Sequence, residues 1–78
     1  MTRDELQAKL DAKGVHPSLY CLDGLARCNE CYCVVHEGNA WKVVYIERAE
    51  PSDIATGLTE SQVYDFVYEQ LRKAFKWT

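Results

Sequence analysis

Apolar residues recur at helical spacing near the start of the chain, where two leucines four residues apart lie among charged and polar positions. Thr2 and Glu5 form a T-x-x-E capping box there, in which each residue's side chain bonds the other's backbone N–H. Gly14 is suited to a left-handed C-terminal cap, and Pro17 blocks any continuation. The pattern predicts a helix over about residues 3–13.

A broader apolar face occurs near the end of the chain. Thr59 and Gln62 form a second capping box in front of it. Its apolar positions are Val63, Phe66, Val67, Leu71 and Ala74, extended by Tyr64, Tyr68 and Phe75. They cover an arc of about 200°, wider than the roughly 100° stripe of most surface helices. We expect this helix to be the central buried one, touching both the sheet and the first helix.

Three segments between the helices have strand character, namely residues 19–22, 30–35 and 41–47. Gly38-Asn39 is a two-residue hairpin signal between the last two, and its length would fix their register. The predicted pairs are Glu37 with Ala40, His36 with Trp41, Val34 with Val43, Cys33 with Val44, Tyr32 with Tyr45, and Cys31 with Ile46.

Residues 48–58 are mostly polar and are expected to form a connection between the last strand and the second helix. With 78 residues, the chain has room for a single domain, residues 1–78. The predicted fold class is α+β. Its architecture is a two-layer α-β-β-β-α arrangement, with a three-stranded antiparallel sheet and both helices on one face.

The two faces of the predicted sheet differ in character. One carries Cys31 and Cys33, and the other carries Tyr32, Trp41 and Tyr45. Two short helices cover only one face. We favour the cysteine face against the helices, which would leave the aromatic face open to a partner. The alternative, in which the aromatic face packs on the helices, stays open.

The four cysteines, Cys21, Cys28, Cys31 and Cys33, allow four interpretations: disulfides, a redox motif, apolar core residues or a metal site. The N-terminal residues lack the apolar stretch of a signal peptide, so we expect a cytoplasmic protein without disulfides. A redox C-x-x-C motif belongs at a helix N-terminus, whereas this one runs into a strand. The favoured interpretation is that Cys31 and Cys33 are small apolar core residues. The alternative is a small zinc-binding adaptor that uses all four cysteines.

Charge and motif content narrow the function. The net charge of −3 lacks the basic excess of a nucleic-acid-binding protein, and no apolar run is long enough to cross a membrane. No catalytic constellation or phosphate-binding loop occurs, so neither an enzyme nor a cofactor is expected. His36 is interpreted as a surface or interface residue.

Two motifs carry a family resemblance. The stretch LYCLDG at residues 19–24 resembles a "YSLDG" signature, and WKVVYIER at residues 41–48 resembles a "W-x-V-x-Y-x-E-R" strand. Both are similar to motifs of small bacterial immunity proteins from polymorphic-toxin and contact-dependent inhibition systems. In such proteins the position of Arg48 is often followed by glycine, whereas here it is followed by Ala49.

The resemblance implies a cytoplasmic, non-catalytic binding protein that neutralises one cognate toxin by direct contact. We expect the chain to be a monomer or a weak dimer. An acidic protein suits a basic partner such as a nuclease domain. The predicted contact residues are Tyr20, Asp23, Tyr32, Trp41, Tyr45 and Glu47. Asp23 has a second explanation, because Asp-Gly is also a turn-forming pair.

Overall fold

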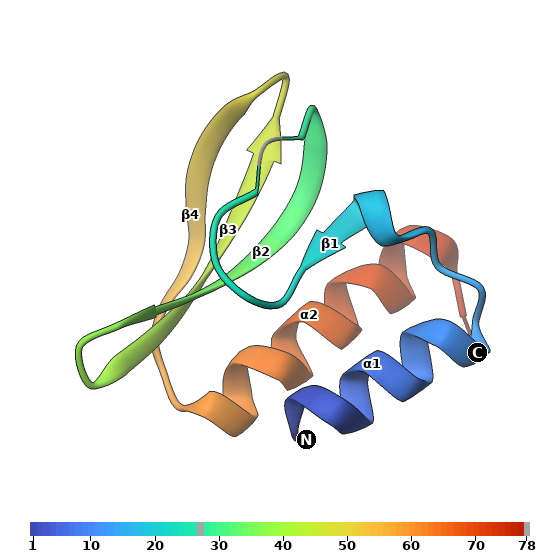
Figure 1. Ribbon diagram of the computed structural model, residues 1–78, viewed down its shortest axis with the longest axis horizontal. Coiled ribbons are helices and arrows are strands. Elements are labelled where there is room, and N and C mark those ends of the chain that lie inside the picture. The colour runs from blue at the N-terminus through green and yellow to red at the C-terminus, as the bar shows by residue number, and fades with distance from the viewer. Residues whose placement is uncertain (27, 78) are drawn as a thin grey trace.

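The computed structural model describes residues 1–26 and 28–77, and it has two layers, a mixed sheet and a pair of helices on one of its faces (Figure 1). The predicted α+β class is confirmed. The elements are, in order, α1 (Arg3–Ala12), the short 3-10 helix η1 (Pro17–Leu19), β1 (Tyr20–Cys21), β2 (Glu30–Glu37), β3 (Ala40–Glu47), β4 (Glu50–Leu58) and α2 (Glu60–Phe75). No helix within the described residues is both long and apolar enough to cross a membrane.

Both helices begin as their sequences predict. The capping boxes of Thr2 with Glu5 and of Thr59 with Gln62 are complete, each with its two reciprocal hydrogen bonds. After α1, Gly14 takes a φ of 69°, which a residue without Cβ adopts at little cost. The backbone N–H of the residue after it, Val15, then donates to the carbonyl of Leu10 at 3.0 Å and closes the end of the helix.

The predicted β2–β3 hairpin has the predicted register throughout, from Glu37 opposite Ala40 to Cys31 opposite Ile46. The prediction of a purely antiparallel sheet is wrong at one edge. There β1 runs parallel to β2, with Tyr20 opposite Tyr32. A parallel pair needs a crossover rather than a tight turn, and the connection between β1 and β2 makes it by crossing one face of the sheet (Figure 1).

The prediction of a polar connection over residues 48–58 is also wrong, because β4 forms a fourth strand antiparallel to β3. Its burial pattern explains why the sequence did not predict it. Only Ala55 and Leu58 are half-buried and the rest of the strand is exposed. The register also shifts twice, between Trp41 and Val43 and between Val43 and Val44, which interrupts the alternation. Backbone pairing, rather than an apolar face, therefore defines this strand.

The aromatic face of the sheet lies against the helices, so the favoured prediction of an open aromatic face is wrong. Val34 and Val43 share one core with the buried residues of both helices, and Tyr20, Tyr32 and Trp41 pack around it. The broad arc of α2 needs large partners to fill the space beneath it, and the aromatic side chains provide the volume. Within this core, burying Val67 and Leu71 of α2 contributes about 1.5–3 kcal/mol each.

The opposite face of the sheet holds a second, smaller core. Cys31, Cys33, Val44 and Ile46 are at most 5% exposed there. The connection between β1 and β2 covers them with Ala26 and Cys28. The prediction that Cys31 and Cys33 are buried apolar residues is confirmed, but a loop covers them in place of the helices.

Candidate functional site

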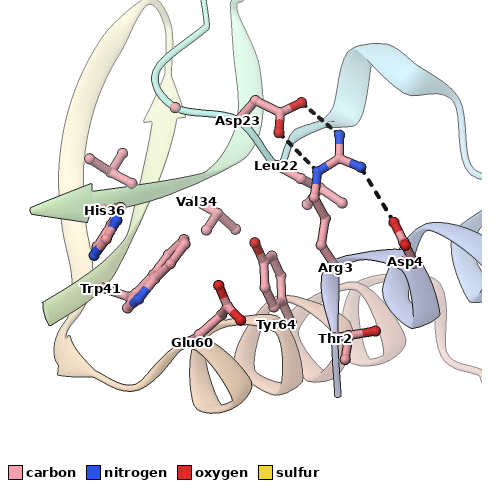
Figure 2. A pocket seen from close by; sticks show the side chains of 12 residues that line it. Thr2, Arg3, Asp4, Leu22, Asp23, Val34, His36, Trp41, Glu60 and Tyr64 are labelled. Carbon is pink, nitrogen blue, oxygen red and sulfur yellow. Dashed lines mark hydrogen bonds and ion pairs between the residues drawn. The ribbon is translucent and has the colours of Figure 1, made fainter. Parts of the chain in front are cut away.

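A groove of about 630 Å³ opens where the N-terminal ends of α1 and α2 meet the β2–β3 hairpin (Figure 2). Both capping boxes place a helix start at its rim, and the two-residue turn sets which hairpin side chains reach it. Its lining residues are Thr2, Arg3, Asp4, Leu22, Asp23, Gly24, Val34, Val35, His36, Trp41, Glu60 and Tyr64. The groove thus combines aromatic rings with charged groups, and its lining comes from four separate stretches of the chain.

Trp41 forms the aromatic wall of the groove. It lies opposite His36 in the hairpin register, and the two rings stack with centroids 4.1 Å apart and planes 8° from parallel. Tyr64 of α2 lies on the helix side, with its centroid 5.9 Å from that of Trp41. Trp41 is thereby fixed between a strand neighbour and a helix, and a ring held in this way can bind a partner with little loss of conformational entropy.

Tyr64 is the buried polar residue of the groove. Its side chain is part of the main core and is only 3% exposed. No hydrogen bond among the described residues involves its hydroxyl, and in that same part of the chain no fully buried side-chain oxygen lacks a partner. The hydroxyl oxygen is therefore reached from the groove. Burial raises the pKa of Tyr64, and the nearby Glu60 carboxylate raises it further.

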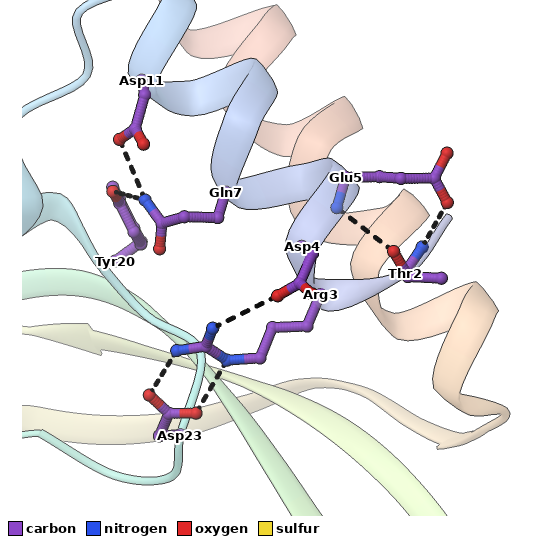
Figure 3. A network of polar contacts seen from close by, with 8 residues as sticks. All are labelled: Thr2, Arg3, Asp4, Glu5, Gln7, Asp11, Tyr20 and Asp23. Carbon is purple, nitrogen blue, oxygen red and sulfur yellow. Dashed lines mark hydrogen bonds and ion pairs between the residues drawn. The ribbon is translucent and has the colours of Figure 1, made fainter.

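An ion pair between α1 and the connection after β1 forms another part of the rim (Figure 3). The Arg3 guanidinium donates to both carboxylate oxygens of Asp23, at 2.9 and 2.6 Å. The hydrogen bond from Arg3 lowers the pKa of Asp23 below its usual value. A third nitrogen of Arg3 lies 3.9 Å from Asp4. Asp23 is therefore already paired within the chain.

Glu60, the first residue of α2, leaves the groove with excess negative charge. Asp4, Asp23 and Glu60 supply three carboxylates and Arg3 one guanidinium, which gives a net charge of −2. Arg3 is engaged with Asp23 and Asp4, and no ion pair among the described residues includes Glu60. In Figure 2 the Glu60 carboxylate points into the space between Trp41 and Tyr64. A cationic group would find an acceptor at this position.

The six predicted contact residues do not form one surface. Asp23 and Trp41 line the groove. Tyr32 and Tyr45 are cross-strand neighbours with centroids 4.7 Å apart, and they line a separate depression of about 130 Å³ near the C-terminal end of α2. Glu47 is exposed at the far end of β3, beside the turn to β4.

Tyr20 makes its contacts within the protein, with α1 and the main core, instead of forming an outer surface. It is half-buried against the main core, and its hydroxyl accepts a 2.7 Å hydrogen bond from the Gln7 side chain (Figure 3). The same Gln7 amide donates to Asp11, so one side chain ties β1 to α1.

Three important groove residues, Arg3, Glu60 and Tyr64, were not predicted from the sequence. Arg3 and Glu60 each stand next to a capping residue, where a charged side chain is usual and attracts no attention. Tyr64 falls within the apolar arc of α2 and was assigned to the core, where most of its ring does lie. The available signal was its hydroxyl, because a buried tyrosine usually needs a hydrogen-bond partner.

The four cysteines are neighbours in sequence and space: Cys21 is in β1, Cys31 and Cys33 are in β2, and Cys28 is in the connection before β2. Cys28 and Cys31 are joined by a disulfide, so the expectation of a chain without disulfides is wrong. Cys33 Sγ lies 3.5 Å from Cys31 Sγ, and Cys21 is the strand neighbour of Cys33. Burial raises the pKa of the Cys33 thiol, which makes it a weak nucleophile at neutral pH.

The zinc hypothesis required all four sulfurs as ligands. In the disulfide form, Cys28 and Cys31 have no thiolates to offer. Within residues 1–26 and 28–77, no group of three or more histidine, cysteine or acidic side chains is arranged to hold a metal ion.

In comparisons with known proteins, no protein family, no curated protein and no solved structure matches this chain.

Proposed function

We propose that this chain is a small non-enzymatic binding protein that neutralises a bacterial toxin by direct contact, in the manner of an immunity protein. The observation that carries the proposal is the groove. One wall of the groove is formed by the stacked rings of Trp41 and His36, and the groove has a net charge of −2. The two helices that border it both begin with complete capping boxes. Preformed aromatic surfaces with complementary charge are typical of tight protein inhibitors.

The sequence motifs support the same function independently. The LYCLDG stretch contributes Asp23 to the groove, and the WKVVYIER stretch contributes Trp41. The two segments that resemble immunity-protein motifs therefore meet at one place in the fold. The partner is proposed to be a basic toxin domain, which the acidic groove would attract electrostatically.

Co-expression with the toxin domain encoded beside this gene tests the proposal. The native chain is expected to restore growth and to co-purify with the toxin. His36→Ala removes an exposed ring from the groove and should weaken toxin binding about tenfold. His16→Ala, at an exposed site outside the groove, is the matched control and should bind normally. The proposed function would be refuted if the neighbouring gene does not encode a toxin and no toxin co-purifies with the chain.

A further inference from the structure

We propose that the groove receives an arginine side chain of the partner, whose guanidinium bonds the Glu60 carboxylate and the Tyr64 hydroxyl and lies against Trp41. This inference rests on the proposed function, and it names the chemistry of the partner at that same site. It gives Glu60 and Tyr64 specific roles in recognition.

Two hydrogen-bond acceptors in the groove are the first reason to propose a cationic ligand. Glu60 is a carboxylate without an ion pair among the described residues, and the Tyr64 oxygen has a lone pair that no described donor uses. The groove reaches the Tyr64 oxygen although the residue is only 3% exposed, so a ligand can bond it without breaking a contact within the protein. A ligand with N–H donors suits both acceptors, whereas an anionic ligand would meet repulsion from the net charge of −2.

The local arrangement distinguishes arginine from lysine. The acceptors belong to two different side chains, and an aromatic ring stands beside them (Figure 2). A guanidinium is planar, carries five donors in a fixed fork and stacks on aromatic rings. An ammonium is a compact, strongly hydrated charge and uses such an arrangement less well. The protein itself provides a precedent at the same rim, where Arg3 bonds Asp23 with two nitrogens.

Glu60 also has a structural role that the test must separate from binding. An acid in the first turn of α2 interacts favourably with the helix dipole. Glu60→Gln keeps the shape and removes the charge. The matched control is Glu50→Gln, which removes one carboxylate at the exposed start of β4, away from the groove. Tyr64→Phe removes only the hydroxyl.

The probes are N-acetyl-arginine amide, the lysine amide and the citrulline amide, which is a neutral isostere of arginine. Each is titrated into ¹⁵N-labelled protein and followed by two-dimensional NMR. Arginine amide is expected to shift the Trp41 indole signal and the amide signals of Glu60 and Tyr64. Lysine amide should bind more weakly, and citrulline amide weaker still. Glu60→Gln should weaken arginine binding about tenfold and Tyr64→Phe about fivefold, while Glu50→Gln leaves it unchanged.

Three results would each overturn the inference. They are equal binding of citrulline and arginine amides, tighter binding of the lysine amide, or unchanged arginine binding in a folded Glu60→Gln variant. The outcome is separable from that of the proposed function. A toxin complex insensitive to Glu60→Gln would remove the arginine site and leave the immunity function intact. Arginine binding without any toxin partner would do the reverse.

Discussion

Some residues in this protein adopt a backbone conformation that their side chains disfavour, and Ala49 is the clearest example. In the turn between β3 and β4, Arg48 and Ala49 have φ values of 54° and 66°. This left-handed conformation suits a tight hairpin turn but costs an L-residue roughly 1–2 kcal/mol because of its Cβ. The sequence resemblance pointed to glycine at this position, and the backbone explains why glycine belongs there.

Ala49→Gly is therefore expected to stabilise the protein. Relief of the left-handed strain outweighs the extra freedom that glycine gives the unfolded chain, for a net gain of about 1 kcal/mol in the free energy of unfolding. Urea denaturation followed by circular dichroism measures it. Ser52→Gly, within β4, is the control and should lower stability, because an extended strand position gains nothing from glycine. A loss of stability in Ala49→Gly would contradict the strain argument.

At the scale of elements, the disulfide between Cys28 and Cys31 fastens the connection between β1 and β2 to the start of β2. That connection covers the cysteine face and also carries Asp23 at the rim of the groove. Closing such a short loop stabilises the fold by about 2 kcal/mol, through restriction of the unfolded chain.

Reduction of the native chain is accordingly expected to lower the free energy of unfolding by about 2 kcal/mol. Urea titrations with and without a phosphine reductant measure the difference. Cys28→Ser should already have the lower stability and should no longer respond to reductant. Cys21→Ser keeps the disulfide and should respond as the native chain does. Equal stability of the native chain in both conditions would show that the bond does not restrain the fold.

The elements also show what the sequence could and could not predict. The helix starts and the hairpin register were predictable, because caps such as Thr59 with Gln62 and turns such as Gly38-Asn39 act locally. The edge strand β4 was not, since backbone pairing holds it and few of its side chains are buried.

Local sequence patterns could not predict which face of the sheet meets the helices, and they could not predict the groove. The choice of face depends on how much volume fits beneath α2. The groove depends on Arg3, Glu60 and Tyr64 coming together from different helices. Of the predicted contact residues, only Asp23 and Trp41 reach it.

At the scale of the whole molecule, β4 forms one edge of the sheet. Among residues 1–26 and 28–77 the strand order is β1-β2-β3-β4, so β4 pairs with β3 on one side only. An open edge can pair with another copy unless its residues oppose this. Pro51 lacks an N–H to donate, and Asp53 places a charge on the strand, where it pairs with Lys42 at 3.5 Å. A missing N–H and a charged side chain both oppose pairing of β4 with a further strand.

Replacing both, in Pro51→Val with Asp53→Val, is expected to produce concentration-dependent association through β4, because the variant edge combines a restored N–H with two strand-favouring side chains. Light scattering coupled to size-exclusion chromatography would detect it as a rising average mass. The control adds two valines on α1, at the exposed Ala8 and Ala12, where the backbone is already hydrogen-bonded within the helix. If both variants associate equally, added apolar surface rather than strand pairing is responsible, and the edge argument fails.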